Sequence, residues 1–236
     1  GHAKNVANFQ DLIEFVTAYG ATYNPSKNSL KLPQLIALKA SADATLADVI
    51  TKNTNYNNKV NERITAFSGL KSLSTRLVNA LQTTDATTET IGNAKTFNRK
   101  MQGKKASSSQ TPTDPNTPAP NTISTSQQSY DQLIQHLAGL TSILEAETSY
   151  TPNETDLQVA TLQTKIADLT AKNTAVATAY ASISNSRIAR NETLYSSSTG
   201  LVETANEVKK YIKSVFGASS PQFAQVKGIQ FKIIKN

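Results

Sequence analysis

The sequence contains no cysteine and only two histidines among its 236 residues. Without cysteine, disulfides, thiolate metal sites and cysteine nucleophiles are excluded. His2 and His136 have no partner histidine at metal-ligand spacing, so we interpret His136 as a surface or boundary residue. The nine glycines form neither of the common phosphate-binding loop patterns. We therefore expect no metal and no cofactor.

Long hydrophobic runs are also missing. The longest apolar stretches, such as residues 35–38, cover a few residues, whereas a membrane-spanning helix needs about 20. The sequence thus predicts a soluble chain without a transmembrane segment. It begins Gly1-His2-Ala3 and its single methionine is Met101, so we expect that the natural start has been trimmed or replaced. Both a cytoplasmic and an exported location stay open.

Charged residues are few, at 17% of the chain, and positive charge is unevenly distributed. Residues 1–105 hold 14 Lys and Arg against 7 Asp and Glu, whereas residues 121–236 hold 10 against 9. Together with Asp114, these give the formal charge of +7. The basic excess belongs to the first half of the chain.

Four short matches between the two halves indicate an internal duplication. The matched pairs are residues 8–13 with 129–134, 23–25 with 150–152, 52–54 with 172–174, and 68–70 with 199–201. The order of the matches is conserved, and their offsets are 121, 127, 120 and 131. Insertions in loops would account for the changing offset.

A segment rich in proline, serine and threonine separates the two copies. Four prolines between Pro112 and Pro120 are incompatible with a helix. The sequence therefore predicts a first helical-bundle repeat at 1–105, a linker at 106–126 and a second helical-bundle repeat at 127–236.

Apolar residues at spacings of three and four predict three long helices in each repeat. These helices cover 9–19, 42–56 and 70–81 in the first repeat, and 130–144, 162–180 and 201–215 in the second. Asn8 and Ser129 are the predicted N-caps of the first helix of each repeat. We expect turns near Asn57 and Asn185, each making an antiparallel helical hairpin. The predicted fold class is all-α, with two tandem duplicated bundles of three long helices plus a short closing segment each.

The closing segments are the best candidates for binding nucleic acid or another anionic polymer. Each contains one matching phenylalanine, Phe97 or Phe231, and Phe97 could stack on a base. The candidate contacts are Lys95, Arg99, Lys100, Lys104, Lys105, Lys232 and Lys235. Further lysines crowd the C-terminal region at Lys209, Lys210, Lys213 and Lys227. The alternative interpretation is a solvated basic face whose lysines complement helix dipoles.

Asn53 and Asn173 fall at the same position of the apolar seam in the matched segments. A buried asparagine there would form a polar core that fixes helix register, as in coiled coils. The alternative is that both side chains reach solvent near the end of a bundle.

Carboxylates offer little catalytic pattern. Glu203 and Glu207 lie one helical turn apart, but Lys210 is placed to form an ordinary surface ion pair with Glu207. We therefore expect a noncatalytic structural or interaction module with an unidentified protein partner. Nucleic-acid or anionic-polymer binding is the alternative function. An enzyme with a carboxylate site between the bundles is the third option.

Overall fold

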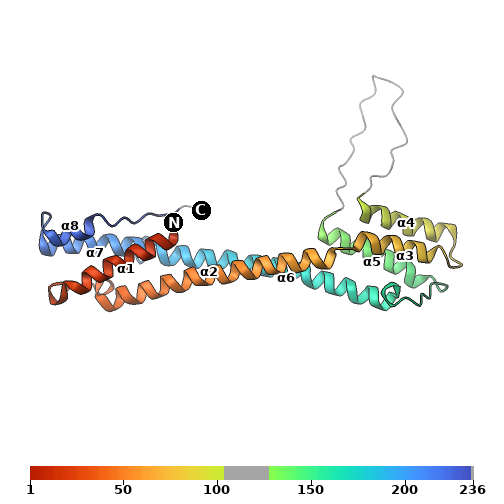
Figure 1. Ribbon diagram of the computed structural model, residues 1–236, viewed down its shortest axis with the longest axis horizontal. Coiled ribbons are helices and arrows are strands. Elements are labelled where there is room, and N and C mark those ends of the chain that lie inside the picture. The colour runs from red at the N-terminus through yellow and green to blue at the C-terminus, as the bar shows by residue number, and fades with distance from the viewer. Residues whose placement is uncertain (104–127, 235–236) are drawn as a thin grey trace, which may run out of the picture. The chain divides into compact units, whose positions relative to one another are not determined.

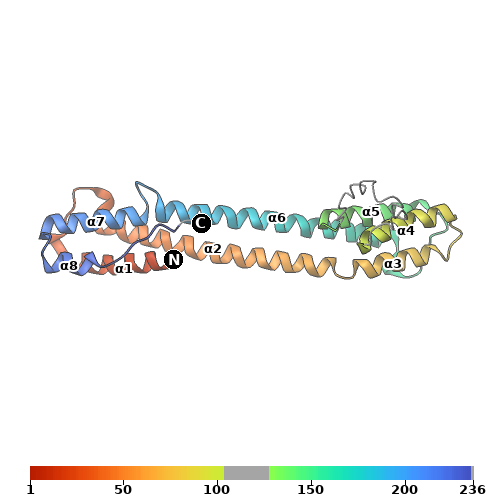
Figure 2. The same cartoon turned by 90° about the horizontal axis from the view of Figure 1, so that it is seen from above.

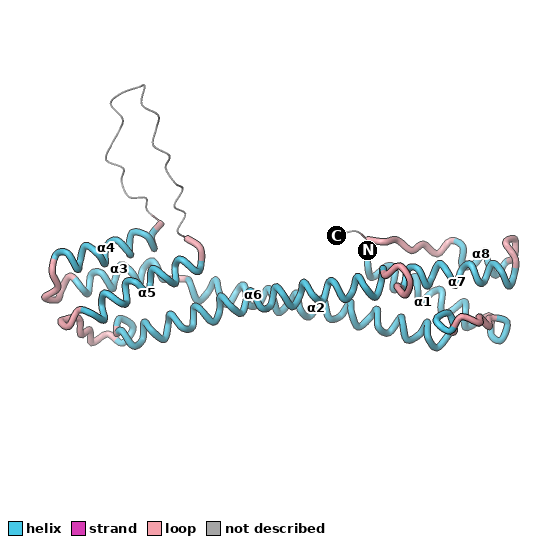
Figure 3. The backbone as a smooth tube through the Cα atoms, turned by 180° about the vertical axis from the view of Figure 1, so that it is seen from behind, coloured by secondary structure: helices cyan, strands magenta, loops and turns pink. Residues whose placement is uncertain are grey.

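The computed structural model describes residues 1–103 and 128–234, and within these ranges all regular structure is helical (Figure 3). The all-α prediction is therefore confirmed for this part of the chain. The α-helices are α1 (His2–Ala18), α2 (Leu32–Phe67), α3 (Leu70–Leu81), α4 (Thr88–Gln102), α5 (Tyr130–Ala146), α6 (Val159–Tyr195), α7 (Leu201–Phe216) and α8 (Pro221–Lys227). The predicted linker, 106–126, lies outside the described residues.

The predicted turns near Asn57 and Asn185 are wrong, because both positions lie inside continuous helices. No glycine or proline occurs between Pro33 and Gly69, or between Pro152 and Gly200, so nothing interrupts either helix. Gly69, with φ of 78°, and Gly200 stand at the N-caps of the next helices, α3 and α7. The matched Gly-Leu pairs thus mark the breaks between α2 and α3 and between α6 and α7.

One predicted helix start is confirmed and the other is wrong. Ser129 caps α5, since its side chain accepts a hydrogen bond from the backbone N–H of Gln132 at 3.3 Å. Asn8 instead lies inside α1, which begins at His2. The first closing segment is the 15-residue helix α4, whereas residues 229–234 of the second are extended.

The chain forms two compact units that each contain parts of both predicted repeats. Unit 1 consists of residues 1–57 and 179–236, and unit 2 of residues 58–178. Because α2 and α6 do not turn back at their midpoints, each helix contributes one part to each unit. Figure 1 shows the consequence in colour: unit 1 combines the two ends of the chain, red and blue, and unit 2 combines its middle.

The core of unit 1 is formed by α1, the start of α2, the end of α6, α7 and α8. Phe9 and Leu12 of α1 are fully buried, as are Leu35 of α2 and Leu194 of α6. The core of unit 2 is formed by the corresponding set: α5, the start of α6, the end of α2, α3 and α4. Each core is therefore closed by helices from opposite halves of the sequence.

The two cores bury matching positions. On α1 and α5, at an offset of 128, these are Phe9, Leu12, Ile13, Val16 and Leu137, Leu140, Thr141, Leu144. On α2 and α6, at 127, they are Leu35, Ala42 and Leu162, Leu169. On α3 and α7, at 131, they are Leu70, Ser74, Leu77, Leu81 and Leu201, Ala205, Val208, Ile212. The sequence matches with offsets of 127 and 131 have the same offsets as the buried positions of their segments. The matches with offsets of 121 and 120 differ by seven residues from the offsets of the corresponding buried positions, 128 and 127.

The loop before each long helix repeats the same side-chain bond. The hydroxyl of Tyr23 donates to the carbonyl of Leu30 at 2.7 Å, and that of Tyr150 donates to the carbonyl of Leu157 at 2.8 Å. All four residues are buried. Burial raises the pKa of Tyr23 above its usual range and that of Tyr150 to about 12. A buried phenol therefore ties each loop together in both units.

Candidate anion-binding site

The basic residues predicted in the first closing segment lie in unit 2. Lys95, Arg99 and Lys100 are exposed on α4, where Arg99 and Lys100 occupy the last turn and complement the helix dipole. Lys104 and Lys105 lie outside the described residues. Helix α4 thus presents three exposed cations on its surface.

Phe97 is not available to stack on a base. Its ring packs in the core of unit 2 against α5, so close to Gly139 that any Cβ there would overlap it. Lys100 covers the ring, with Nζ 5.5 Å from the ring centroid. Glycine at position 139 therefore permits the close approach of α4 and α5.

In the second closing segment, Lys232 has an exposed side chain but a firmly held backbone. Its N–H donates to Oδ1 of Asn5 at 3.0 Å, and its carbonyl accepts from Nδ2 of Asn5 at 2.7 Å. Phe231 packs edge-on against Phe9, with ring centroids 6.4 Å apart, and so is likewise not free to stack. Lys235 lies outside the described residues.

The most concentrated group of cations lies in unit 1, between α7 and α8. Lys209, Lys210 and Lys213 of α7 share one side of the helix at spacings of three and four, and Lys227 ends α8. With Phe223 they line an open pocket of about 300 Å³. We call this group the lysine pocket.

Helix α8 has local features that hold it in place beside α7. The Ser220 side chain caps it by accepting from the N–H of Phe223 at 3.0 Å, and Pro221 occupies its first turn. Val226 is fully buried against α7 and its neighbours, and the Tyr19 hydroxyl of α1 donates to the carbonyl of Gln222 at 2.9 Å. These contacts fix the position of Lys227.

Among the described residues, no carboxylate forms an ion pair with the lysine pocket. The predicted pair of Glu207 with Lys210 is not formed, since Glu207 pairs with Lys27. Lys213 lies over the Phe223 ring, with Nζ 5.7 Å from its centroid. Four like charges on one hollow attract anions.

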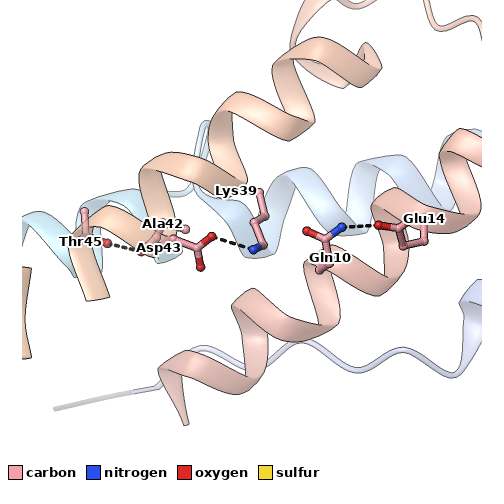
Figure 4. A network of polar contacts seen from close by, with 6 residues as sticks. All are labelled: Gln10, Glu14, Lys39, Ala42, Asp43 and Thr45. Carbon is pink, nitrogen blue, oxygen red and sulfur yellow. Dashed lines mark hydrogen bonds and ion pairs between the residues drawn. The ribbon is translucent and has the colours of Figure 1, made fainter. Parts of the chain in front are cut away.

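Some other charged residues of unit 1 bond to neighbours one helical turn away. Lys39 pairs with Asp43 at 2.6 Å, and Gln10 donates to Glu14 one turn further along α1 (Figure 4). Such contacts between residues four apart are ordinary on helix surfaces. The lysines of the pocket differ from these residues because none of them forms an ion pair with a described carboxylate.

Lys209 has a special place in the pocket because it is half-buried, whereas the other three lysines are exposed. Its Nζ donates to the carbonyl of Ile229 at 2.7 Å and lies 5.9 Å from the centroid of Phe231. Burial lowers the pKa of Lys209 below its usual range. A bound anion would therefore compensate an ammonium group that has lost part of its hydration.

A second, more open pocket of about 560 Å³ lies in unit 2. It contains two carboxylates, but each is bonded to a lysine: Glu62 to Lys59 at 3.0 Å and Asp168 to Lys172 at 3.1 Å. The described residues contain no group of three or more histidine, aspartate or glutamate side chains that could hold a metal. This pocket offers paired surface charges rather than a free acid and base.

The two predicted core asparagines do not share a structural position. Asn53 is exposed in unit 1, whereas Asn173 is half-buried in unit 2. Asn173 accepts from Nη1 of Arg63 at 2.9 Å and donates to Oδ1 of Asp131 at 2.7 Å. Arg63 also covers the ring of Tyr130, 4.0 Å from its centroid. Asn173 is thus part of a polar cluster at the edge of the unit 2 core.

His136 is buried and not at the surface, contrary to the sequence interpretation. Its ring lies beside that of Phe97, with centroids 6.4 Å apart. His2 contacts the Tyr195 hydroxyl through Nδ1 at 2.7 Å. The two histidines lie in different units, and each packs against an aromatic ring.

No protein-family model matches this sequence, and no curated protein and no solved structure is significantly similar to it. None of the described helices is both long and apolar enough to cross a membrane. The candidate site is therefore defined by its own geometry. The sequence contained a usable signal for it: three lysines on one face of a helix, followed by a Ser-Pro helix start and a fourth lysine at the next helix end.

Proposed function

We propose that this protein is a noncatalytic binding module whose lysine pocket binds the phosphate or sulfate groups of a linear anionic polymer. The observation that carries the proposal is the placement of Lys209, Lys210, Lys213 and Lys227 on one pocket without a paired carboxylate among the described residues. Protein-partner binding, nucleic-acid binding and anionic-polymer binding are all compatible with a noncatalytic module, and the pocket favours the last.

The chemistry of the pocket indicates which part of a polymer it contacts. Lysine is a compact point charge, and it lacks the planar fork with which arginine makes two parallel bonds to one anion. Lys213 covers one face of the Phe223 ring, which disfavours stacking of a base on that face. Binding should thus depend on charge density and salt concentration, not on base sequence.

The noncatalytic part of the proposal is supported by how the carboxylates are used. Glu62, Asp168 and Glu207, which sequence and pocket geometry suggest as candidate acids, are each bonded to a lysine.

We further propose that the architecture arose by duplication followed by exchange of segments between the two copies. Each unit combines the first helix and the start of the second helix from one copy with the end of the second helix and later elements from the other. The matching buried positions and the repeated Tyr23 and Tyr150 bonds support this origin. Residues 106–126 would then join the copies.

A salt titration tests the proposed function. We expect labelled heparin oligosaccharide or short duplex DNA to bind at about 50 mM NaCl and to be released at about 200 mM. Each lysine contact with duplex DNA should contribute about 0.9 to the slope of log affinity against log salt. Tighter binding of heparin would indicate that the pocket prefers sulfate groups, and tighter binding of DNA would indicate that it prefers phosphate groups.

Two charge-removal variants identify the site. Replacing Lys209, Lys210, Lys213 and Lys227 by glutamine should abolish retention at low salt. The matched control, Lys95→Gln with Arg99→Gln and Lys100→Gln on α4, should retain most of the affinity. Unchanged binding by the pocket variant, or no binding of either polymer by the unmodified protein, would disprove the proposed function.

Interaction with a protein partner remains the second candidate function, and one observation favours it. Unit 1 exposes several large apolar side chains on its long helices, among them Ile50 of α2, Tyr180 and Ile188 of α6. Self-association can be measured by sedimentation velocity. A concentration-dependent increase in sedimentation coefficient that Ile50→Ser and Ile188→Ser abolish would support this candidate.

A further inference from the structure

The last described residues, 229–234, form an extended segment that returns along unit 1 toward the start of α1 (Figures 1 and 2). We call it the C-terminal segment. Three side chains bind its backbone from two helices. On α1, Asn5 holds Lys232 through both backbone groups, and Asn8 donates to the carbonyl of Gln230 at 2.6 Å. On α7, Lys209 donates to the carbonyl of Ile229 at 2.7 Å.

Asn5 is the central residue of this arrangement. It is only 3% exposed, which is unusual for an amide side chain on a helix that otherwise buries apolar residues. Its carboxamide accepts from the N–H and donates to the carbonyl of the same residue, as a neighbouring β-strand would. It also lies 3.3 Å from the Tyr195 hydroxyl. Such a bidentate bond requires an extended backbone at Lys232.

The C-terminal segment and the lysine pocket meet at Lys209. An ammonium group has three N–H donors, and the carbonyl of Ile229 accepts one of them. The docked segment thus fixes Nζ at the wall of the pocket while leaving donors for a ligand. Lys227, whose position the contacts of α8 fix, lies next to the segment, because only Gly228 separates it from Ile229. One of the four pocket lysines, Lys209, is therefore held directly by the docked segment.

We infer that Asn5 is a positioning residue of the anion site and that docking of the C-terminal segment and anion binding strengthen each other. A bound anion is held best when Lys209 and Lys227 are fixed, and the same anion opposes the separation of Lys209 from Ile229. By thermodynamic linkage the two effects are equal in size. This inference rests on the proposed function, since it concerns the same pocket.

The direct test is Asn5→Ala, with heparin oligosaccharide as the probe at about 50 mM NaCl. We expect the affinity to fall about fivefold, at the lower end of typical coupling between sites. The matched control is Asn173→Ala, which removes a bonded asparagine from unit 2 and should leave the affinity unchanged. In a Lys209→Gln background, Asn5→Ala should have little further effect, because the residue that it positions is already missing.

A second variant covers the case in which Asn5→Ala destabilises unit 1. Deleting residues 229–236 removes the segment itself and should reduce affinity at least as much as Asn5→Ala. Because the deletion also removes two lysines, Lys232→Gln with Lys235→Gln is its charge control and should have a smaller effect. Circular dichroism of each variant checks that the helices are retained.

The reciprocal effect provides a readout that a purely structural role of Asn5 would not change. Heparin oligosaccharide should slow hydrogen exchange of the amides of residues 230–234 in the unmodified protein but not in Lys209→Gln. If pocket lysines are required for binding while Asn5→Ala and the deletion bind normally, the positioning role is wrong and the proposed function stands. If the variant lacking all four lysines binds normally, the proposed function itself is wrong.

Discussion

Units 1 and 2 bury matching residues but complete their cores with different kinds of structure. The core of unit 2 is completed by α4, the closing helix of the first repeat, which packs on α3 and α5 and buries Ala94 and Met101. In unit 1 the corresponding element is the seven-residue α8, followed by the extended C-terminal segment. A helix satisfies its own backbone groups, whereas an extended single segment needs partners from elsewhere.

This difference explains why polar side chains of unit 1 bind the backbone of its final segment. Asn5, Asn8 and Lys209 of unit 1 bind the backbone of the C-terminal segment. The positions of α5 that face α4 include Gly139, which provides room for the Phe97 ring. Counted back from the helix ends, the position in α1 that corresponds to Gly139 is Asp11, which is exposed. The chemistry of unit 1 thus follows from the shortness of its last helix.

The largest expected effects come from matched core truncations. Leu12→Ala in unit 1 and Leu140→Ala in unit 2 remove equivalent, fully buried side chains, and each should cost about 2–5 kcal/mol of stability. Hydrogen exchange followed by mass spectrometry should show lost protection mainly in the unit that carries the change. Equal loss of protection in both units after Leu12→Ala would show that the two cores unfold together.

Removal of the two loop phenols tests how alike the units are. Tyr23→Phe and Tyr150→Phe each leave a buried carbonyl without its donor, which should cost about 1–2 kcal/mol in chemical denaturation. The two losses should agree within the error of the measurement. A large difference would mean that the shared bond has a different role in each unit.

The same tyrosines predict how stability changes at alkaline pH. Burial raises the pKa of Tyr150 to about 12 in the folded state, so the folded chain keeps a proton that the unfolded chain loses above its ordinary pKa of 10. The stabilisation is therefore complete below pH 10 and declines as the pH rises from 10 toward 12. Tyr150→Phe should make this decline shallower, and an unchanged alkaline denaturation profile would contradict it.

Glycine substitutions should give the smallest effects, with opposite signs. Gly139→Ala places a methyl group against the Phe97 ring and should destabilise unit 2 by about 1 kcal/mol or more. Gly92→Ala on α4 is the matched control, because open space surrounds it and alanine favours the helix by about 1 kcal/mol. Thermal unfolding of the two variants compares them directly, and stabilisation by Gly139→Ala would show that α4 can move away from α5.

The sequence was sufficient to locate part of each long helix, but not the full extent of α2 and α6, nor α8, nor the way in which the helices are shared between units. Apolar spacing identified the long elements, and the Tyr-x-Pro and Gly-Leu matches marked equivalent loops. Two other matches were displaced by seven residues, because a helix with a heptad-like seam repeats its buried face every seven residues. Asn53 and Asn173 were paired through one of these displaced matches, which is why they occupy different environments.

The site was only partly predictable for a different reason. Spacing along α7 places Lys209, Lys210 and Lys213 together, but the addition of Lys227 depends on how α8 folds back. The contact of Lys209 with Ile229 joins residues 20 apart, and that of Asn5 with Lys232 joins residues 227 apart. Local patterns contain no information about pairs so distant in sequence. Phe97 was assigned to stacking because the exposure of its ring cannot be read from the sequence alone.

The division of the chain into units also sets the order in which the protein can be completed during synthesis. Residues 58–178 contain all of unit 2, whereas residues 1–57 must meet residues 179–236 to form unit 1. At ordinary rates of translation, α1 therefore waits roughly 10–40 s for α7 and α8 to be made. During that interval Phe9 and Leu12 have no native partners from the end of the chain. Helix α1 leaves the ribosome before the other described helices but is among the last of them to be buried.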